Sequence, residues 1–215
     1  IIMFIYILGT AQDGGYPHPG CKQVCCIESG ENKNLARYAS SIALINESTR
    51  EYWLLDVTPD YKKQIKFLES FNCSLKGVFI THAHVGHYLG LMNFGLEIMN
   101  LDKIPVYVMP KMKFFMENNP MIEQLSINNN IDIQPLHDNL PINLYEQFQI
   151  IPFEVPHRNE LSETVGFRIR GEKESAIYLP DIDSWGGWEN NLCELVSQNN
   201  FLFIDGTFFT KDEIK

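Results

Sequence analysis

The chain has 215 residues, of which 45% are hydrophobic and 20% are charged, and its formal net charge is -10. This length favours one domain with a sizeable core, and this composition excludes a disordered chain. The acidic excess, with no basic run longer than Lys62 and Lys63, disfavours nucleic acid as a partner because phosphate binding needs clustered positive charge. We therefore predict a single globular domain over residues 1–215.

The chain opens on an apolar run, residues 1–8, that ends at Gly9. The run is too short to cross a membrane, and it lacks the basic flank and the cleavage pattern of a signal peptide. We expect a buried first strand and no membrane span.

Three of the five cysteines, Cys21, Cys25 and Cys26, crowd into one loop with His18 nearby. Adjacent cysteines do not readily bridge each other, so the cluster favours a metal site over a disulfide framework, with buried unligated thiols as the alternative. Cysteine usage leaves the compartment open; we favour the cytoplasm, with export as the alternative.

Short β-rich runs alternate with helical patterns along the chain, which indicates an α/β fold. Thr58 and Pro59 predict a helix start, and Ile65 and Leu68 follow at helical spacing. The expected strands are 3–8, 40–45, 51–56, 77–81, 105–109, 148–155, 165–170, 175–181 and 201–206, and the expected helices are 59–71, 88–99, 110–118 and 188–198.

Candidate metal ligands follow the ends of four predicted strands. Asp56 closes EYWLLD, His82 and His84 follow GVFIT, His157 follows FQIIPFEVP, and Asp181 follows SAIYLP. Ligands bind at the carboxyl ends of strands in α/β sheets because loops converge there. The pattern predicts a site built from these side chains.

The residue types favour a metal ion. Neutral imidazole and carboxylate suit zinc, and His82 and His84, two residues apart on an extended loop, can face one ion. A bound ion lowers the pKa of a water to about 7 and supplies hydroxide at neutral pH. Trp185 and Trp188, just after Asp181, are expected to pack in the core rather than to wall a pocket.

The ordered set Asp56, H-A-H-V-G-H at 82–87, His157 and Asp181 resembles the metallo-β-lactamase superfamily. VPHRNELSETVGFRI at 155–169, YLPDIDSW at 178–185, FIDGTFF at 203–209 and the opening LGTAQDGGYPHPGC are similar to the branch that contains pyrroloquinoline quinone (PQQ) synthesis protein B. The resemblance runs from residue 7 to residue 209 and implies an αββα sandwich, two sheets with helices outside.

The resemblance also implies roles for single residues. His82, His84 and His157 would hold a first metal ion, and Asp181 would bridge to a second ion and orient the attacking water. His87 would be a weak ligand of that second ion or a proton carrier. Asp56 would brace the histidine loop by hydrogen bonds.

The sequence departs from the family pattern at three places. Gly86 stands where the loop H-x-H-x-D-H has its aspartate, so we expect one firmly held ion. The family's last motif histidine has no counterpart before Lys215, which implies that the closing strands and helix lie outside this chain. His84 stands where the PQQ protein usually has another residue type, which argues against close functional equivalence.

The cysteine loop has a counterpart in the same branch, where three cysteines in C-x-C-x-x-C and a distant histidine surround a structural zinc. Cys21 and Cys26 keep that spacing, Gln23 replaces the middle cysteine, and Cys25 could substitute for it. A zinc bound there would stabilise a loop rich in glycine and proline.

These features favour a zinc-dependent hydrolase that acts on an ester, a phosphodiester or a related bond in a small molecule. One alternative is an iron-dependent oxygenase of the PQQ synthesis protein B type, with manganese as a further candidate metal. Another is a non-catalytic binding or carrier protein, for which Gly86 and the missing last histidine argue.

Overall fold

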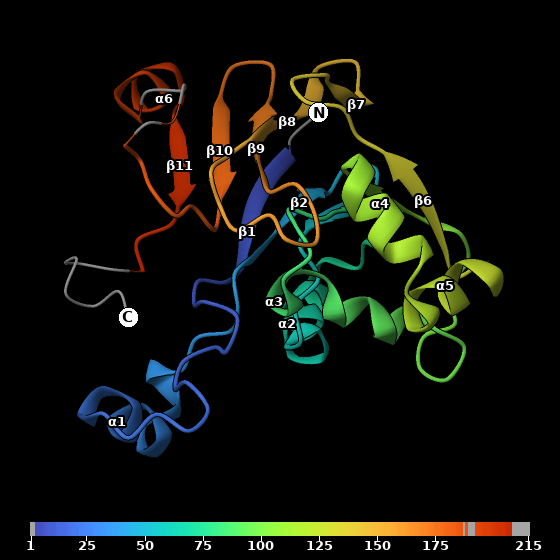
Figure 1. Ribbon diagram of the computed structural model, residues 1–215. Coiled ribbons are helices and arrows are strands. Elements are labelled where there is room, and N and C mark those ends of the chain that lie inside the picture. Colours follow the sequence, from blue (N-terminus) through green and yellow to red (C-terminus); the bar gives the residue numbers. More distant parts are fainter. Residues whose placement is uncertain (1–2, 187, 189–191, 208–215) are drawn as a thin grey trace. The chain divides into compact units, whose positions relative to one another are not determined.

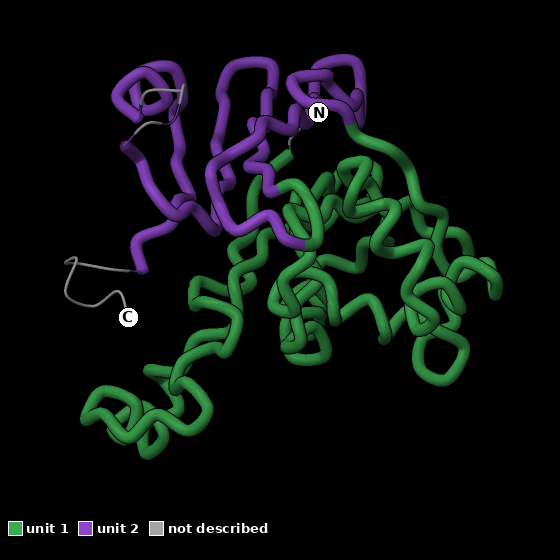
Figure 2. The backbone as a smooth tube through the Cα atoms, viewed as in Figure 1, with its two compact units in different colours: residues 1–136, 161–163 green, residues 137–160, 164–215 purple. Residues whose placement is uncertain are grey.

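The computed structural model describes residues 3–186, 188 and 192–207 (Figure 1). The chain forms two compact units, which Figure 2 shows in different colours. Unit 1 comprises residues 1–136 and 161–163, and unit 2 comprises residues 137–160 and 164–215. The single domain expected from the length of the chain stays a prediction.

Unit 1 is built on a six-stranded sheet with the order β1-β2-β3-β4-β5-β6. Neighbours pair antiparallel from β1 to β3 and parallel from β3 to β6. The carboxyl ends of β3 to β6 therefore share one edge of the sheet. The strands are β1 (Met3–Gly9), β2 (Ser41–Asn46), β3 (Glu51–Leu55), β4 (Ser74–Phe79), β5 (Ile104–Val108) and β6 (Ile131–Pro135).

The helices of unit 1 pack with this sheet around one hydrophobic cluster that includes Leu54, Val78 and Phe94. The α-helices are α1 (Val24–Glu31), α2 (Tyr61–Leu68), α3 (Val85–Tyr88), α4 (Pro110–Glu117) and α5 (Pro120–Ile127). Three 3-10 helices are η1 (Lys33–Leu35), η2 (Glu69–Phe71) and η3 (Leu89–Phe94).

Unit 2 has a five-stranded sheet with the order β11-β10-β9-β8-β7. Its elements are β7 (Ile142–Tyr145), β8 (Phe148–Glu154), β9 (Val165–Arg170), β10 (Ser175–Leu179), α6 (Leu192–Gln198) and β11 (Phe201–Ile204). Trp185 and Trp188 pack against the core cluster of this unit, and the ring of Trp188 stacks on Phe153 at 5.9 Å. The packing expected for both tryptophans is confirmed.

The predicted α/β class is confirmed, with two sheets and six α-helices in the described residues, and each of the nine expected strands is present. Helix 59–71 begins later than expected, because Thr58 and Asp60 form a turn in which the Tyr61 N–H donates to the Thr58 carbonyl. The predicted helix 88–99 is instead α3 followed by η3, which ends at Phe94. Part of the predicted helix 188–198 lies outside the described residues, and α6 begins at Leu192.

None of the helices in the described part of the chain combines the length and the apolar character that crossing a membrane requires.

Candidate metal centre

Two neighbouring strands of unit 1 position the first group of site residues. Asp56 directly follows β3, and Thr81 and His82 follow β4, which pairs with β3 in parallel. The backbone N–H of Asp56 donates to the Phe79 carbonyl at 2.8 Å, and this bond holds the two strand ends together. The parallel pairing therefore brings the candidate ligands of both strand ends to one edge of the sheet.

The carboxylate of Asp56 is fully buried and accepts hydrogen bonds from two neighbours. The Thr81 N–H donates to Oδ1 at 2.8 Å, and the Thr81 hydroxyl lies 3.0 Å from Oδ2 and 3.1 Å from Oδ1. The third contact is Nδ1 of His87, 2.8 Å from Oδ2. These donors offset the cost of burying the charge, and they fix the carboxylate against the histidine loop.

The proton of the Thr81 hydroxyl decides which nitrogen of His82 can bind a metal. An ionised carboxylate only accepts hydrogen bonds, so the Thr81 hydroxyl donates to Asp56. Nδ1 of His82, 2.9 Å from the same Thr81 oxygen, must then donate to it. The lone pair of a neutral His82 ring therefore lies on Nε2.

His84 faces this lone pair. Nδ1 of His84 lies 2.8 Å from Nε2 of His82, and the two rings meet edge to face at 81°. Two imidazole nitrogens that converge in this way can share a metal ion or a proton. The donor set and its orientation fit a metal ion that prefers nitrogen ligands.

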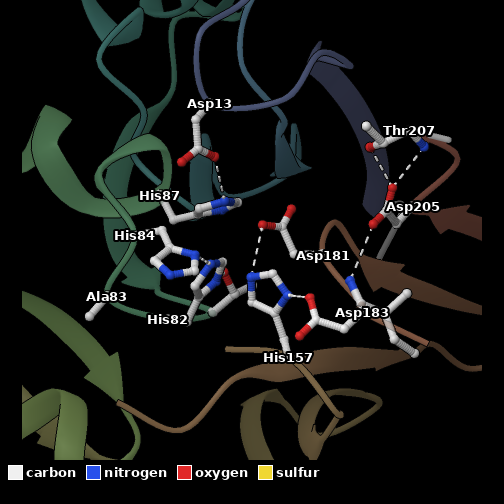
Figure 3. Close-up of polar contacts among 12 residues, drawn as sticks. Asp13, His82, Ala83, His84, His87, His157, Asp181, Asp183, Asp205 and Thr207 are labelled. Carbon is white, nitrogen blue, oxygen red and sulfur yellow. Dashed lines mark hydrogen bonds and ion pairs between the residues drawn. The ribbon is translucent and has the colours of Figure 1, made fainter. Parts of the chain in front are cut away.

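His87 is buried between two carboxylates of unit 1. Its Nδ1 contacts Asp56, and its Nε2 lies 3.2 Å from Oδ1 of Asp13. Figure 3 shows Asp13 facing the ring of His87. Asp13 belongs to the loop after β1, and it is not among the site residues that the sequence predicts. Its only signal in the sequence is a place in the glycine-rich loop, and nothing in that loop indicates a contact with His87.

Unit 2 carries a second group of candidate ligands. His157 follows β8 and Asp181 follows β10, and Nε2 of His157 lies 3.5 Å from Oδ2 of Asp181 (Figure 3). Nδ1 of His157 lies 2.8 Å from Oδ1 of Asp183, so that carboxylate accepts the Nδ1 proton and leaves the lone pair on Nε2. This histidine and Asp181 offer a nitrogen and an oxygen that suit a metal ion.

The loop that carries Asp181 is held by three hydrogen bonds within unit 2. The Asp183 N–H donates to the Pro156 carbonyl at 2.9 Å, which ties the loop after β10 to the loop after β8. Oδ2 of Asp205 accepts from the Ile182 N–H at 3.2 Å, and the Asp205 N–H donates to the Leu179 carbonyl at 2.8 Å. The stretches LPDID and FIDG thus meet where β10 pairs with β11.

Asp183 and Thr81 are further residues of the site that were not predicted from the sequence. A signal for Asp183 exists, because it stands two positions after Asp181 in LPDID. Thr81 stands directly before the histidine loop. Its role depends on the direction of its hydrogen bonds with Asp56 and His82, which cannot be predicted from the sequence.

The cysteines of the N-terminal loop contribute no ligand group in the described residues. Cys21, Cys25 and Cys26 are free, and no set of three ligand atoms that includes them lies close enough to hold an ion. Cys25 and Cys26 stand on α1, and Nδ1 of His18 contacts the Pro19 carbonyl. The zinc site expected at this loop stays a prediction.

Comparison with known proteins gives one family match and several similar proteins. The Beta-lactamase superfamily domain matches residues 53–215. Coenzyme PQQ synthesis protein B of Nitrosococcus oceani is 24% identical over 243 residues, which cover 99% of this chain and 76% of the relative. The protein of the same name from Xanthomonas campestris pv. campestris is 21% identical over 234 residues and covers 99% and 75%.

Two solved structures share the fold. Zn(2+)-bound PqqB from Methylobacterium extorquens has a TM-score of 0.71 and 21% identity over 84% of this chain and 66% of that chain. A diphosphatase from the PhnP family has a TM-score of 0.61 and 23% identity over 83% of this chain and 65% of that chain. The chain thus spans about two thirds of the length of each structure. The family match and the resemblance to PQQ synthesis protein B agree, and the chain belongs to the Beta-lactamase superfamily.

Proposed function

We propose that the chain is a metal-dependent hydrolase in which His82, His84, His157 and Asp181 hold the catalytic ion. The observation that carries the proposal is the pair of ring nitrogens in unit 1. Nε2 of His82 and Nδ1 of His84 converge at 2.8 Å, while Thr81 takes up the other nitrogen of His82. A ring held in this way presents its lone pair without further rearrangement.

Unit 2 supports the proposal independently. Asp183 holds Nδ1 of His157, so the Nε2 lone pair points to the side of the ring where Asp181 lies. A histidine whose far nitrogen contacts a carboxylate is the usual arrangement of a metal-ligating histidine. Zinc is the proposed ion because imidazole and carboxylate suit it and the similar PqqB structure is Zn(2+)-bound.

A bound ion of this kind lowers the pKa of a water to about 7 and polarises the bond under attack. Asp181 would orient the attacking water through its carboxylate. The water oxygen would bond to the phosphorus or the acyl carbon, and the bond from that atom to the leaving oxygen would break. The leaving oxygen takes its proton from water or from His87.

Hydrolysis assays with a ligand variant and a matched control test the proposal. Protein loaded with zinc or manganese should cleave bis(p-nitrophenyl) phosphate or p-nitrophenyl esters, and His82→Ala should abolish cleavage. His137→Ala is the control, because His137 is exposed and belongs to no ligand group in the described residues. Cleavage that persists in His82→Ala would overturn the proposal.

Similarity to PQQ synthesis protein B over 99% of the chain favours a second candidate, an iron-dependent oxygenase. Two histidines and one carboxylate with open positions also suit iron(II). Elemental analysis of anaerobically purified protein separates the candidates, because stoichiometric zinc without iron contradicts the oxygenase. A metal-loaded protein that binds the probes and cleaves none would support the non-catalytic binding protein instead.

A further inference from the structure

Position 86 has no room for a side chain, because Asp13 already occupies the space. A Cβ atom on Gly86 would meet the carboxyl group of Asp13 at clash distance and would lie 2.8 Å from its Cα. Gly86 stands in α3 and does not have a positive φ, so the backbone conformation does not require glycine. The Asp13 carboxylate thus stands where a short side chain at position 86 would reach.

The loop that carries Asp13 is fixed on both sides by backbone hydrogen bonds. The Ala11 N–H donates to the Tyr38 carbonyl at 2.9 Å, and the Ser40 N–H donates to the Ala11 carbonyl at 2.8 Å. After Asp13, the Gly15 N–H donates to the Gln12 carbonyl at 2.7 Å and closes a turn. The chain therefore presents the carboxylate at a defined place.

Backbone hydrogen bonds also fix the position of His87. Its N–H donates to the His84 carbonyl at 3.0 Å, and its carbonyl accepts from the Val57 N–H at 2.8 Å. Asp56 takes the proton of Nδ1, so a neutral His87 ring carries its lone pair on Nε2. That nitrogen is the one that lies 3.2 Å from Oδ1 of Asp13.

Two lone-pair donors that face each other at this distance need a cation between them. The cation is either a second proton on His87, which gives an imidazolium between two carboxylates, or a metal ion that both groups coordinate. The side chain of Asp13 is 35% exposed, whereas that of His87 is 3% exposed, so water can complete a coordination shell on the Asp13 side. One imidazole and one carboxylate with water suit zinc, manganese or iron.

We propose that Asp13 and His87 are the unit 1 ligands of a second metal ion, and that Asp13 supplies the carboxylate that position 86 lacks. The proposal rests on the proposed hydrolase, because the ring centroids of His82 and His87 lie 4.2 Å apart in unit 1 and the second ion would neighbour the first. The sequence predicts one firmly held ion because Gly86 offers no ligand, and Asp13 supplies the carboxylate whose absence led to that prediction. His87 is then a ligand, and the leaving oxygen takes its proton from water.

Counting bound ions tests the assignment without relying on activity. The full chain is saturated with zinc, freed of excess ion by gel filtration and analysed by inductively coupled plasma mass spectrometry. Every protein carries Cys21→Ser, Cys25→Ser and Cys26→Ser, so that a zinc at the N-terminal cysteine loop does not enter the count. In this background the parent chain, with Asp13 and Gly86 unchanged, should hold two ions, whereas Asp13→Asn and Asp13→Gly should hold one. Asp132→Asn is the matched control, because Asp132 is an exposed aspartate on β6, and it should keep two ions.

Moving the carboxylate provides the sharper test. Gly86→Asp alone should lower stability, because the new side chain clashes with Asp13. The double variant Asp13→Gly with Gly86→Asp removes the clash with the carboxyl group and restores the loop H-x-H-x-D-H. A Cβ at position 86 would still lie 2.8 Å from the Cα at position 13, so the loop after β1 must shift, and the folded double variant should hold two ions again. Loaded with manganese, the parent chain and the double variant should both give the spin-coupled signal of an ion pair, and Asp13→Gly should give the signal of an isolated ion.

Each result has a distinct meaning. A parent chain that holds one ion overturns the second site and leaves the hydrolase standing, and a parent chain without any ion overturns the hydrolase itself. Two ions in a folded Asp13→Asn variant overturn the assignment of Asp13. If circular dichroism shows that Asp13→Gly or the double variant does not fold, the isosteric Asp13→Asn decides: one ion supports the proposal, and two ions overturn it.

Discussion

At the residue scale, Asp56 controls the orientation of two histidine rings. It holds His87 directly and His82 through the hydroxyl of Thr81. Both rings therefore carry a proton on Nδ1 and present Nε2, although the two histidines stand five positions apart in the chain. One buried carboxylate thus orients a histidine ligand for each of the two proposed ions.

We expect Asp56→Asn to weaken binding of zinc by about 10- to 100-fold, because such partners of metal-ligating histidines have effects of this size. The amide nitrogen of asparagine cannot accept a hydrogen bond, so either the Thr81 hydroxyl or Nδ1 of His87 would lose its acceptor. The substitution should therefore also lower the free energy of unfolding by about 1–3 kcal/mol. Competition with a chromophoric chelator measures the affinity, and unchanged affinity would contradict the role of Asp56.

Asp183 allows a graded test in unit 2. Asparagine can still accept the Nδ1 proton of His157 through its amide oxygen, whereas alanine cannot. We expect Asp183→Ala to weaken zinc binding by about 10-fold or more and Asp183→Asn to keep most of the affinity. Titration calorimetry with zinc gives both values, and equal losses in the two variants would mean that the charge of Asp183 matters rather than the hydrogen bond.

At the scale of elements, the sequence identified the strands by their β-branched and aromatic runs. It missed β6 and β7, since IDIQP mixes polar residues with a proline and INLY has only four residues. It also missed α1, which has a glycine near its end, and α5, which begins at Pro120 after an asparagine cap. Short elements such as β7 and α1 depend on packing more than on local preference. For α5, by contrast, Asn119 and Pro120 are the same kind of start signal as Thr58 and Pro59, so this helix could have been predicted.

The candidate ligands after strands could be predicted because strand ends follow from local pattern. Asp13 could not, since its position depends on how the loop after β1 is fixed by Tyr38 and Ser40. Asp183 could have been predicted from the sequence, because LPDID places a second carboxylate two positions after Asp181. Contacts between segments far apart in the chain need the folded structure.

The segment 161–163 holds the histidine loop by a hydrogen bond. It belongs to unit 1, although the residues before and after it in the sequence belong to unit 2. The hydroxyl of Ser162 accepts from the Ala83 N–H at 2.9 Å and donates to the Glu163 carbonyl at 2.8 Å. The segment thus satisfies a buried backbone donor between His82 and His84.

We expect Ser162→Ala to lower the free energy of unfolding by about 1–3 kcal/mol, because the Ala83 N–H would lose its acceptor. Urea unfolding followed by tryptophan fluorescence measures the change. Ser70→Ala is the matched control, since Ser70 is exposed and makes a long hydrogen bond of 3.4 Å to the Phe67 carbonyl. An equal effect in both variants would contradict the proposed support.

At the scale of the whole molecule, two core tyrosines link folding to alkaline pH. Burial raises the pKa of Tyr52 from 10.0 to about 12, and burial also raises the pKa of Tyr61. Above pH 10 the unfolded chain releases these protons while the folded chain keeps them. The stabilising contribution is therefore complete below pH 10 and is lost as pH rises through the folded pKa.

We expect the free energy of unfolding to fall by about 1.4 kcal/mol per pH unit for Tyr52 alone between pH 10 and pH 12. Tyr52→Phe removes this contribution, so its stability should fall less steeply over the same interval. Urea unfolding at several pH values gives the two slopes. Parallel slopes would show that the hydroxyl of Tyr52 does not titrate differently in the two states.

The contact between Asp13 and Gly86 also has an evolutionary consequence. Each residue limits the other, because a side chain at position 86 and a carboxylate at position 13 compete for one space. Among relatives, the two positions should therefore covary: aspartate at position 13 should accompany glycine at position 86, and aspartate at position 86 should accompany a small residue at position 13. The superfamily match over residues 53–215 contains position 86 but not position 13. A comparison limited to that region would find no carboxylate ligand for the second ion in proteins with glycine at position 86, although the loop after β1 supplies one.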